Sequence, residues 1–237
     1  MNIKTLLANV TNRWSRNGQS IEYIVMHYVG AVSSAKNNAE YLHRDKNLGW
    51  SAHFFTDEND TYQSVPLDES AGHCGVDYSN GKAPLWGKCR NKNSIGIEMC
   101  CKKDSAGNWF IEPATVDRTV SLVRWLMKQF NIPVSHVVRH YDVCWKRCPE
   151  PWVRDPLQWE DFKKRIAEPE QEGDENMKEV HYHTLSEMPD WYADPLREQI
   201  DRGVPIGRTP TDLDLSESMV RVLVICIRII KNYLGIK

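Results

Sequence analysis

The alternation of apolar strands with helical segments is the feature that most constrains the fold of this chain. Ile21–His27 and Ser94–Cys100 are rich in β-branched and other apolar residues, which is typical of buried strands. Helical periodicity occurs between them, over Ala35–Arg44, and after them, from Val116 to Phe130. Strands interleaved with helices predict an α/β layer architecture, in which sites gather at strand ends and in the loops beyond.

Further segments agree with this architecture. Residues 53–65 contain two short strand patterns around a polar turn and predict a β-hairpin. The loop Gly72–Lys92 contains Gly, Asn and Pro residues, and its length indicates a binding surface. A short apolar run, Val134–Val138, leads to His140. His27 and His140 therefore both lie at strand ends, where an α/β fold places its site.

Two domains joined by a linker are predicted. The first domain is expected over residues 1–167, closing with a helix at Trp159–Ile166. Residues 168–179 begin with an acidic run that contains Pro and Gly, which is typical of a linker. A small helical domain is expected over residues 180–237. The codons before Met177 could spell a ribosome-binding site, which gives the hypothesis that a separate small chain starts there.

Composition limits the partners and the compartment. The chain has 30 Lys and Arg against 32 Asp and Glu, so no overall field attracts nucleic acid or anionic lipid. The most apolar stretch, Met219–Ile230, is interrupted by Arg221 and Arg228, so no membrane insertion is expected. Residues 1–13 carry a very short apolar patch and no small-residue cleavage site. We therefore expect a protein made in the host cytoplasm without a signal peptide.

Seven cysteines are present, and in such a chain most are expected to be reduced, buried side chains. Cys148 differs because it follows His140 closely and precedes a proline. Zinc accepts imidazole nitrogen and thiolate sulfur, and a catalytic site keeps one position for water. A third ligand is needed, for which His27 is the natural donor. The pattern also allows His27 to be a core residue, or Cys148 to be a nucleophile paired with His140.

Five blocks in order carry a family resemblance, and they are Ile24–Tyr28, Ser51–Phe55, Ser70–Gly75, Asn93–Glu98 and His140–Pro149. Together they resemble the amidase-2 family, the N-acetylmuramoyl-L-alanine amidases related to amidase-type phage lysozymes and to peptidoglycan recognition proteins. The resemblance covers roughly residues 20–166. It implies an α/β domain with a central mixed β-sheet flanked by helices.

The resemblance also implies roles for individual residues. The family's zinc ligands match His27, His140 and Cys148. Glu98 matches the carboxylate that activates the metal-bound water, and Lys146 matches the cation that stabilises the oxyanion. His73 matches a histidine near the substrate. Phage members often carry a tyrosine where this chain has Ala52, which weakens a tyrosine-assisted mechanism and favours Glu98; the following residue, His53, is expected to be structural.

A second resemblance concerns the C-terminal segments Met188–Ala193, Ile200–Val204 and Leu213–Val224. They resemble a short module of clostridial-type cell-wall hydrolases and phage endolysins, which implies attachment to the wall and a raised local concentration. A helix pair that forms a homo-oligomer is the alternative. The expected helices run over Trp191–Arg202 and from Ser216, the predicted N-cap, to about Tyr233.

The expected function is hydrolysis of the amide bond between N-acetylmuramic acid and L-alanine in the peptidoglycan of Gram-positive walls, with Zn²⁺ as cofactor. An endolysin released through a holin, or an autolysin, would cause bacterial lysis in this way. The alternatives are a non-catalytic peptidoglycan-binding module of the same fold, a cytosolic amidase of soluble muropeptides and a cysteine peptidase.

Overall fold

Contacts divide the chain into two units, one over Ile3–Glu172 and the other consisting mainly of Gly173–Lys237. The computed structural model describes residues 2–168, 181–206, 213–216, 219–220, 222–224 and 226–227. Most of the predicted linker and Met177 lie outside the described residues, as does most of the helix expected after Ser216. The boundaries at residues 167 and 179 therefore stay a prediction.

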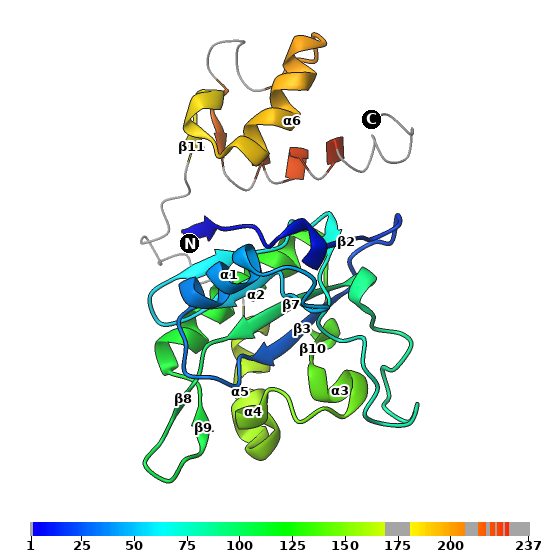
Figure 1. Ribbon diagram of the computed structural model, residues 1–237, viewed down its shortest axis with the longest axis vertical. Coiled ribbons are helices and arrows are strands. Elements are labelled where there is room, and N and C mark those ends of the chain that lie inside the picture. The colour runs from blue at the N-terminus through cyan, green and yellow to red at the C-terminus, as the bar shows by residue number, and fades with distance from the viewer. Residues whose placement is uncertain are drawn as a thin grey trace. The chain divides into compact units, whose positions relative to one another are not determined.

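A six-stranded mixed sheet organises the described part of the first unit (Figure 1). Its strands are β1 (Ile3–Thr5), β3 (Tyr23–Tyr28), β4 (Phe54–Thr56), β5 (Thr61–Gln63), β7 (Ser94–Met99) and β10 (Val137–Arg139). Their spatial order is β1-β5-β4-β7-β3-β10. The pair β4 and β5 is antiparallel, as the predicted hairpin requires, whereas β4, β7, β3 and β10 are parallel neighbours. The prediction of a mixed sheet is confirmed.

The parallel pairing of β3 with β7 aligns the residues used below. His27 lies opposite Glu98, and Glu98 lies opposite Phe55 of β4, so these three side chains share one face of the sheet. Ile24 and Met26 alternate with them and are fully buried. Burial on both faces explains why the β3 sequence is continuously apolar instead of alternating with polar residues.

Helices lie on both sides of the sheet (Figure 1). Helix α1 (Ala35–Arg44) has the predicted bounds because the amide of Asn37 donates to the Oγ of Ser34, the N-cap. Its apolar side packs on Phe55. Helix α2 (Pro113–Phe130) begins with a proline and ends at Asn131, which is left-handed; it packs against β4, β7 and α5 (Pro156–Ala167).

Several short elements were not predicted. They are β2 (Trp14–Ser15), β6 (Glu69–Ser70), β8 (Lys102–Lys103), β9 (Trp109–Phe110), α3 (His140–Cys144) and α4 (Glu150–Arg154). The first four form two small antiparallel pairs, and α3 starts directly after β10. Because β3, β7 and β10 run in the same direction, their carboxyl ends meet at one edge of the sheet. His27 and Glu98 lie near the ends of β3 and β7, and His140 directly follows β10, so the three residues converge at this edge.

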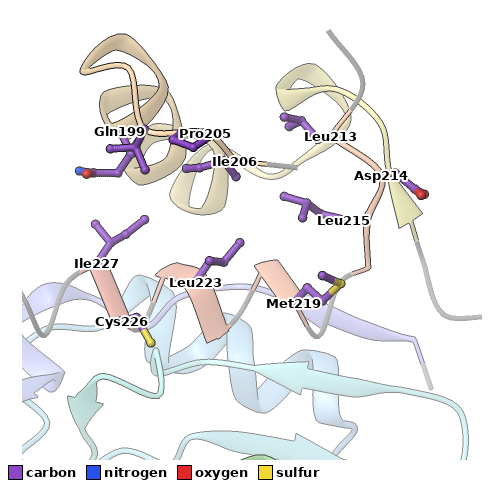
Figure 2. Close-up of a pocket in the computed structure, with 11 residues that line it drawn as sticks. Gln199, Pro205, Ile206, Leu213, Asp214, Leu215, Met219, Leu223, Cys226 and Ile227 are labelled. Carbon is purple, nitrogen blue, oxygen red and sulfur yellow. The ribbon is translucent and has the colours of Figure 1, made fainter. Parts of the chain in front are cut away.

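The second unit combines a helix with a small sheet that was not predicted. Strands β11 (His181–Tyr182) and β12 (Leu215–Ser216) are antiparallel, and α6 covers Asp190–Asp201. The amide of Met219 donates to the Oγ of Ser216 at 3.3 Å, as expected of an N-cap. Apolar side chains between α6 and the segment after β12 line an open groove of about 560 Å³ (Figure 2). Within the described ranges, every helix is too short or too polar to serve as a membrane span.

The carboxylate of Asp57 links the hairpin to α1, and its removal tests how much this link contributes to stability. Its buried carboxylate accepts hydrogen bonds from the amides of Ala35, Asn59 and Asp60 at 2.7–2.8 Å. We expect Asp57→Ala to lower the free energy of unfolding by about 2–4 kcal/mol, because three amides lose a charged acceptor. Urea unfolding measures this change. The exposed Asp161→Ala control should stay within about 0.5 kcal/mol of the native chain, and equal effects of the two substitutions would contradict the assignment.

Candidate metal centre

Three side chains of the metal-ligand type meet at the carboxyl edge of the sheet. The nitrogens of His27 and His140 and the sulfur of Cys148 all lie within 4.8 Å of one another, and all three residues are buried. His27 comes from the end of β3 and His140 from the first turn of α3. Cys148 follows in the loop after α3, where its carbonyl accepts from the amide of Tyr141 at 2.8 Å. The structure thus brings together the three residues that the resemblance implied as ligands.

Burial controls the protonation of these groups. It holds the pKa of His27 well below its usual range, and His140, His73 and Lys146 lower it further. Burial, with the charge of Lys146, lowers the pKa of His140 to about 3. Both imidazoles are therefore neutral at pH 7, as a metal requires. Burial raises the pKa of the Cys148 thiol, so the free thiol is protonated and would ionise on binding a cation.

The donor set fits a zinc ion. Among the described residues, neither ring nitrogen of His140 has a hydrogen-bond partner, although both are buried. Buried polar atoms in native proteins are nearly always satisfied, so an unpartnered imidazole points to a ligand. The Sγ of Cys148 lies 3.7 Å from the Nδ1 of His27, a separation that two ligands of one ion can adopt. Two imidazoles and one thiolate leave a fourth tetrahedral position for water or substrate.

Glu98 lies beside the cluster. Its Oε1 is 4.0 Å from the Nδ1 of His27, and its Oε2 has no hydrogen-bond partner among the described residues. Burial raises the pKa of the Glu98 carboxyl to about 8, and the charge of Lys146 acts in the opposite direction. A carboxyl group with a pKa in this range, next to a metal site, can exchange protons at neutral pH.

Lys146 lies in the loop after α3, two residues before Cys148. Trp145, in the left-handed region at φ 64°, ends α3 and turns the chain, which leaves Lys146 exposed. The positive charge of Lys146 lowers the pKa values of His140 and Glu98. Its role as the cation beside the oxyanion stays a prediction.

His73 contacts the centre through His27. The Nδ1 of His73 is 3.0 Å from the Nε2 of His27, and its Nε2 is 3.1 Å from the Oγ of Ser94. Its ring lies against Gly96, where a Cβ atom would be 2.6 Å from the Cγ of His73. The role of His73 as a substrate contact stays a prediction. The contact with Ser94 was missed, although Ser94 belongs to the Asn93–Glu98 block.

His53 packs beneath this layer and is tied to the backbone. Its Nδ1 accepts from the amide of Gly96 at 3.0 Å, and its Nε2 lies 3.1 Å from the carbonyl oxygen of Glu69. The buried guanidinium of Arg16 donates to the carbonyls of Leu67, Lys92 and Ser94 and also contacts His53. Burial lowers the pKa of Arg16 to about 10. These contacts fit the structural role expected of His53; nothing in the pattern around Arg16 had indicated its burial.

Comparison with known proteins places this geometry in a family. Residues 17–151 match the Amidase_2 model, described as N-acetylmuramoyl-L-alanine amidase. The chain is 33% identical over 169 residues to the N-acetylmuramoyl-L-alanine amidase CwlL of Bacillus licheniformis, and 32% identical over 166 residues to BlyA of Bacillus subtilis (strain 168). Each match covers 65% of this chain and 44% of the relative, so the chain spans under half the length of these curated relatives.

Solved structures agree with the sequence relatives. A mutant endolysin from Bacillus subtilis is 27% identical, with a TM-score of 0.55, over 70% of this chain and 99% of that chain. The catalytic domain of XlyA is 26% identical, with a TM-score of 0.55, over 70% of this chain and 100% of that chain. The central mixed sheet with flanking helices is therefore the fold of these endolysin and amidase domains. The chain belongs to the Amidase_2 family of N-acetylmuramoyl-L-alanine amidases.

Proposed function

We propose that this chain is a zinc-dependent N-acetylmuramoyl-L-alanine amidase that hydrolyses the amide bond between N-acetylmuramic acid and L-alanine in peptidoglycan. The observation that carries the proposal is the buried cluster of His27, His140 and Cys148 with Glu98 beside it. The names of the relatives, which are amidases and endolysins, support the same reaction.

The cluster supplies the ligands, and Glu98 supplies the base. A zinc ion held by His27, His140 and Cys148 would polarise the amide carbonyl and favour ionisation of a bound water. The Oε2 of Glu98, which has no hydrogen-bond partner among the described residues, is available to accept the proton of the attacking water. Glu98 then carries that proton to the nitrogen of L-alanine, which leaves as an amine. In the metal-free chain burial raises the pKa of Glu98 to about 8, and a bound cation would favour the ionised form that can accept this proton.

Lys146 acts on the substrate oxygen. Attack on the amide carbonyl places negative charge on that oxygen, and an ammonium group beside it stabilises the charge. Ala52, which is fully buried, offers no hydroxyl for this purpose. Lys146 is therefore assigned as the cation that faces the oxyanion, and Glu98 as the general base.

Two of the alternatives account less well for the site. A cysteine peptidase needs a thiolate, whereas burial raises the pKa of the Cys148 thiol. A non-catalytic binding module has no use for a buried carboxylate oxygen on Glu98 that lacks a partner in the described part of the chain and lies beside two neutral imidazoles. Soluble muropeptides contain the same amide bond, so a cytosolic amidase would use the same centre. The two amidases differ in the size of the substrate they cleave, which is a soluble fragment for one and the whole wall for the other.

For the second unit, two roles are proposed, attachment to the wall and formation of a homo-oligomer. Attachment through residues 180–237 would keep the catalytic unit close to an insoluble polymer. A homo-oligomer formed through this unit is the competing role, and the mass of the chain in solution distinguishes the two. Access to Gram-positive peptidoglycan would follow release from the host cytoplasm through a holin.

The reaction is tested with purified Gram-positive cell walls. The chain should clear the suspension and release amino groups without reducing sugars; a chelator should stop clearing, and added zinc should restore it. Cys148→Ser should abolish both zinc binding and clearing while circular dichroism shows an intact fold. Clearing that persists with the chelator would overturn the metal mechanism, and binding without clearing would make the chain a recognition module.

Proton release on zinc binding tests Glu98. At pH 7 the metal-free chain carries a proton on Cys148 and, with a pKa of about 8, one on Glu98. A bound cation favours the ionised form of both, so calorimetry in buffers of different ionisation enthalpy should count about one proton fewer for Glu98→Gln than for the native chain. The difference should fall to about half near pH 8 and vanish about two pH units higher, where Glu98 is already ionised in the metal-free chain. Equal counts at pH 7 would contradict a protonated Glu98.

The role of Lys146 as the cation beside the oxyanion is tested by substitution, with the adjacent Arg147 as control. We expect Lys146→Met to lower kcat by about 10²–10³-fold while zinc content stays unchanged, because the variant loses the cation that faces the oxyanion. Arg147→Met is the matched control, since Arg147 is exposed and pairs with Glu150 at 3.3 Å. An equal loss in both variants would point to a general effect of charge instead.

A further inference from the structure

A chain of hydrogen bonds leads from the backbone to the Nε2 of His27, the ring nitrogen that points away from Cys148 and Glu98. Ser94 Oγ is 2.6 Å from the carbonyl oxygen of Arg90, His73 Nε2 is 3.1 Å from Ser94 Oγ, and His27 Nε2 is 3.0 Å from His73 Nδ1. The chain connects four groups from two strands and one loop. The function proposed above uses none of these contacts.

The direction of each bond follows from its first acceptor. A carbonyl oxygen has no proton, so Ser94 must donate to Arg90, and Ser94 Oγ is left to accept from His73. With its proton on Nε2, the His73 ring presents a bare Nδ1, which accepts from the Nε2 of His27. His27 is therefore bare at Nδ1. That atom faces Cys148 Sγ at 3.7 Å and Glu98 Oε1 at 4.0 Å.

His73 is held firmly enough to impose this arrangement. The amides of His73 and Cys74 both donate to the Oδ1 of Asn91, at 3.0 and 2.8 Å. The imidazole lies against the α-carbon of Gly96, with no room for another side chain between them. The loop around His73 and strand β7 therefore hold the His73 ring in place, and that ring holds the proton of His27 on its Nε2.

We propose that His73 is a positioning residue of the metal centre, which holds His27 in the tautomer that presents a bare Nδ1 to the ligand cluster, and that Ser94 sets the tautomer of His73. Partners of this kind, bonded to the outer nitrogen of a ligating histidine, orient the ring and strengthen it as a ligand. The proposal rests on the assignment of His27 as a ligand, which belongs to the proposed function. It does not require His73 to contact substrate.

The tautomers are measured in the chain without metal. Nitrogen-15 chemical shifts separate bare from protonated ring nitrogens, and we expect His27 and His73 both to be protonated at Nε2 and bare at Nδ1. In Ser94→Ala the acceptor for His73 is lost, so both rings should become mixtures of the two tautomers. A His27 that is protonated at Nδ1 in the native chain would overturn the proposal.

Zinc affinity tests the consequence with a matched pair of variants. His73→Asn keeps an acceptor near the position of Nδ1, whereas His73→Leu fills more of the space of the ring and has no acceptor. Competition with a chromophoric chelator for Zn²⁺ alone should show a loss of about 10–100-fold for His73→Leu and a much smaller loss for His73→Asn. A purely packing role predicts the opposite order, because Asn leaves the larger cavity.

The outcomes separate this proposal from the proposed function. Native zinc affinity in a folded His73→Leu chain would overturn the positioning role and leave the amidase assignment intact. A native chain that has the expected tautomers and binds zinc, yet does not clear cell walls, would support the positioning role and refute the amidase.

Discussion

The pairing of β3 with β7 is the constraint on which the candidate site depends. It places His27 directly opposite Glu98, and the parallel neighbour β10 delivers His140 to the same edge. Since side chains alternate along a strand, a shift of one residue would turn His27 to the α2 side of the sheet and separate it from Glu98. The fully buried Ile24 and Met26 oppose such a shift, because they would have to exchange faces with Val25 and His27 and lose their own packing. Core packing therefore aligns the site.

The polar groups at this edge form two layers with different roles. The inner layer is saturated: Arg16 and His53 bond to backbone groups of the strands and loops that carry the centre. The outer layer is unsaturated, since His140 and one oxygen of Glu98 lack partners among the described residues. A preorganised metal site requires this arrangement, in which fully hydrogen-bonded groups support groups that still lack a partner, because the ligands then need not move when the ion binds.

The elements that could be predicted from the sequence are those with strong local patterns. Helix α1 was predicted with the observed bounds, and the structure shows that Ser34 caps it and that Ala35, Ala39 and Leu42 are its buried side. The short strand β1 was not predicted, because three residues pair through the sheet instead of by propensity. Spacing alone left Cys148 and His27 ambiguous, and family resemblance supplied their roles. The contact of His73 with His27 comes from a loop that returns to the sheet, and no periodicity marks such a return.

Gly96 shows how closely the sheet and the candidate site are linked. Glycine inside a strand weakens it, and β-branched residues would suit this position better. The absent side chain, however, is the space that the imidazole of His73 occupies. A single methyl group would push that ring away from His27, although the methyl would lie in the sheet and touch no ligand. A larger residue at position 96 would therefore improve β7 as a strand but displace His73 from the candidate metal centre. Gly96 has no reactive group, yet it is one of the residues of this strand that are hardest to replace.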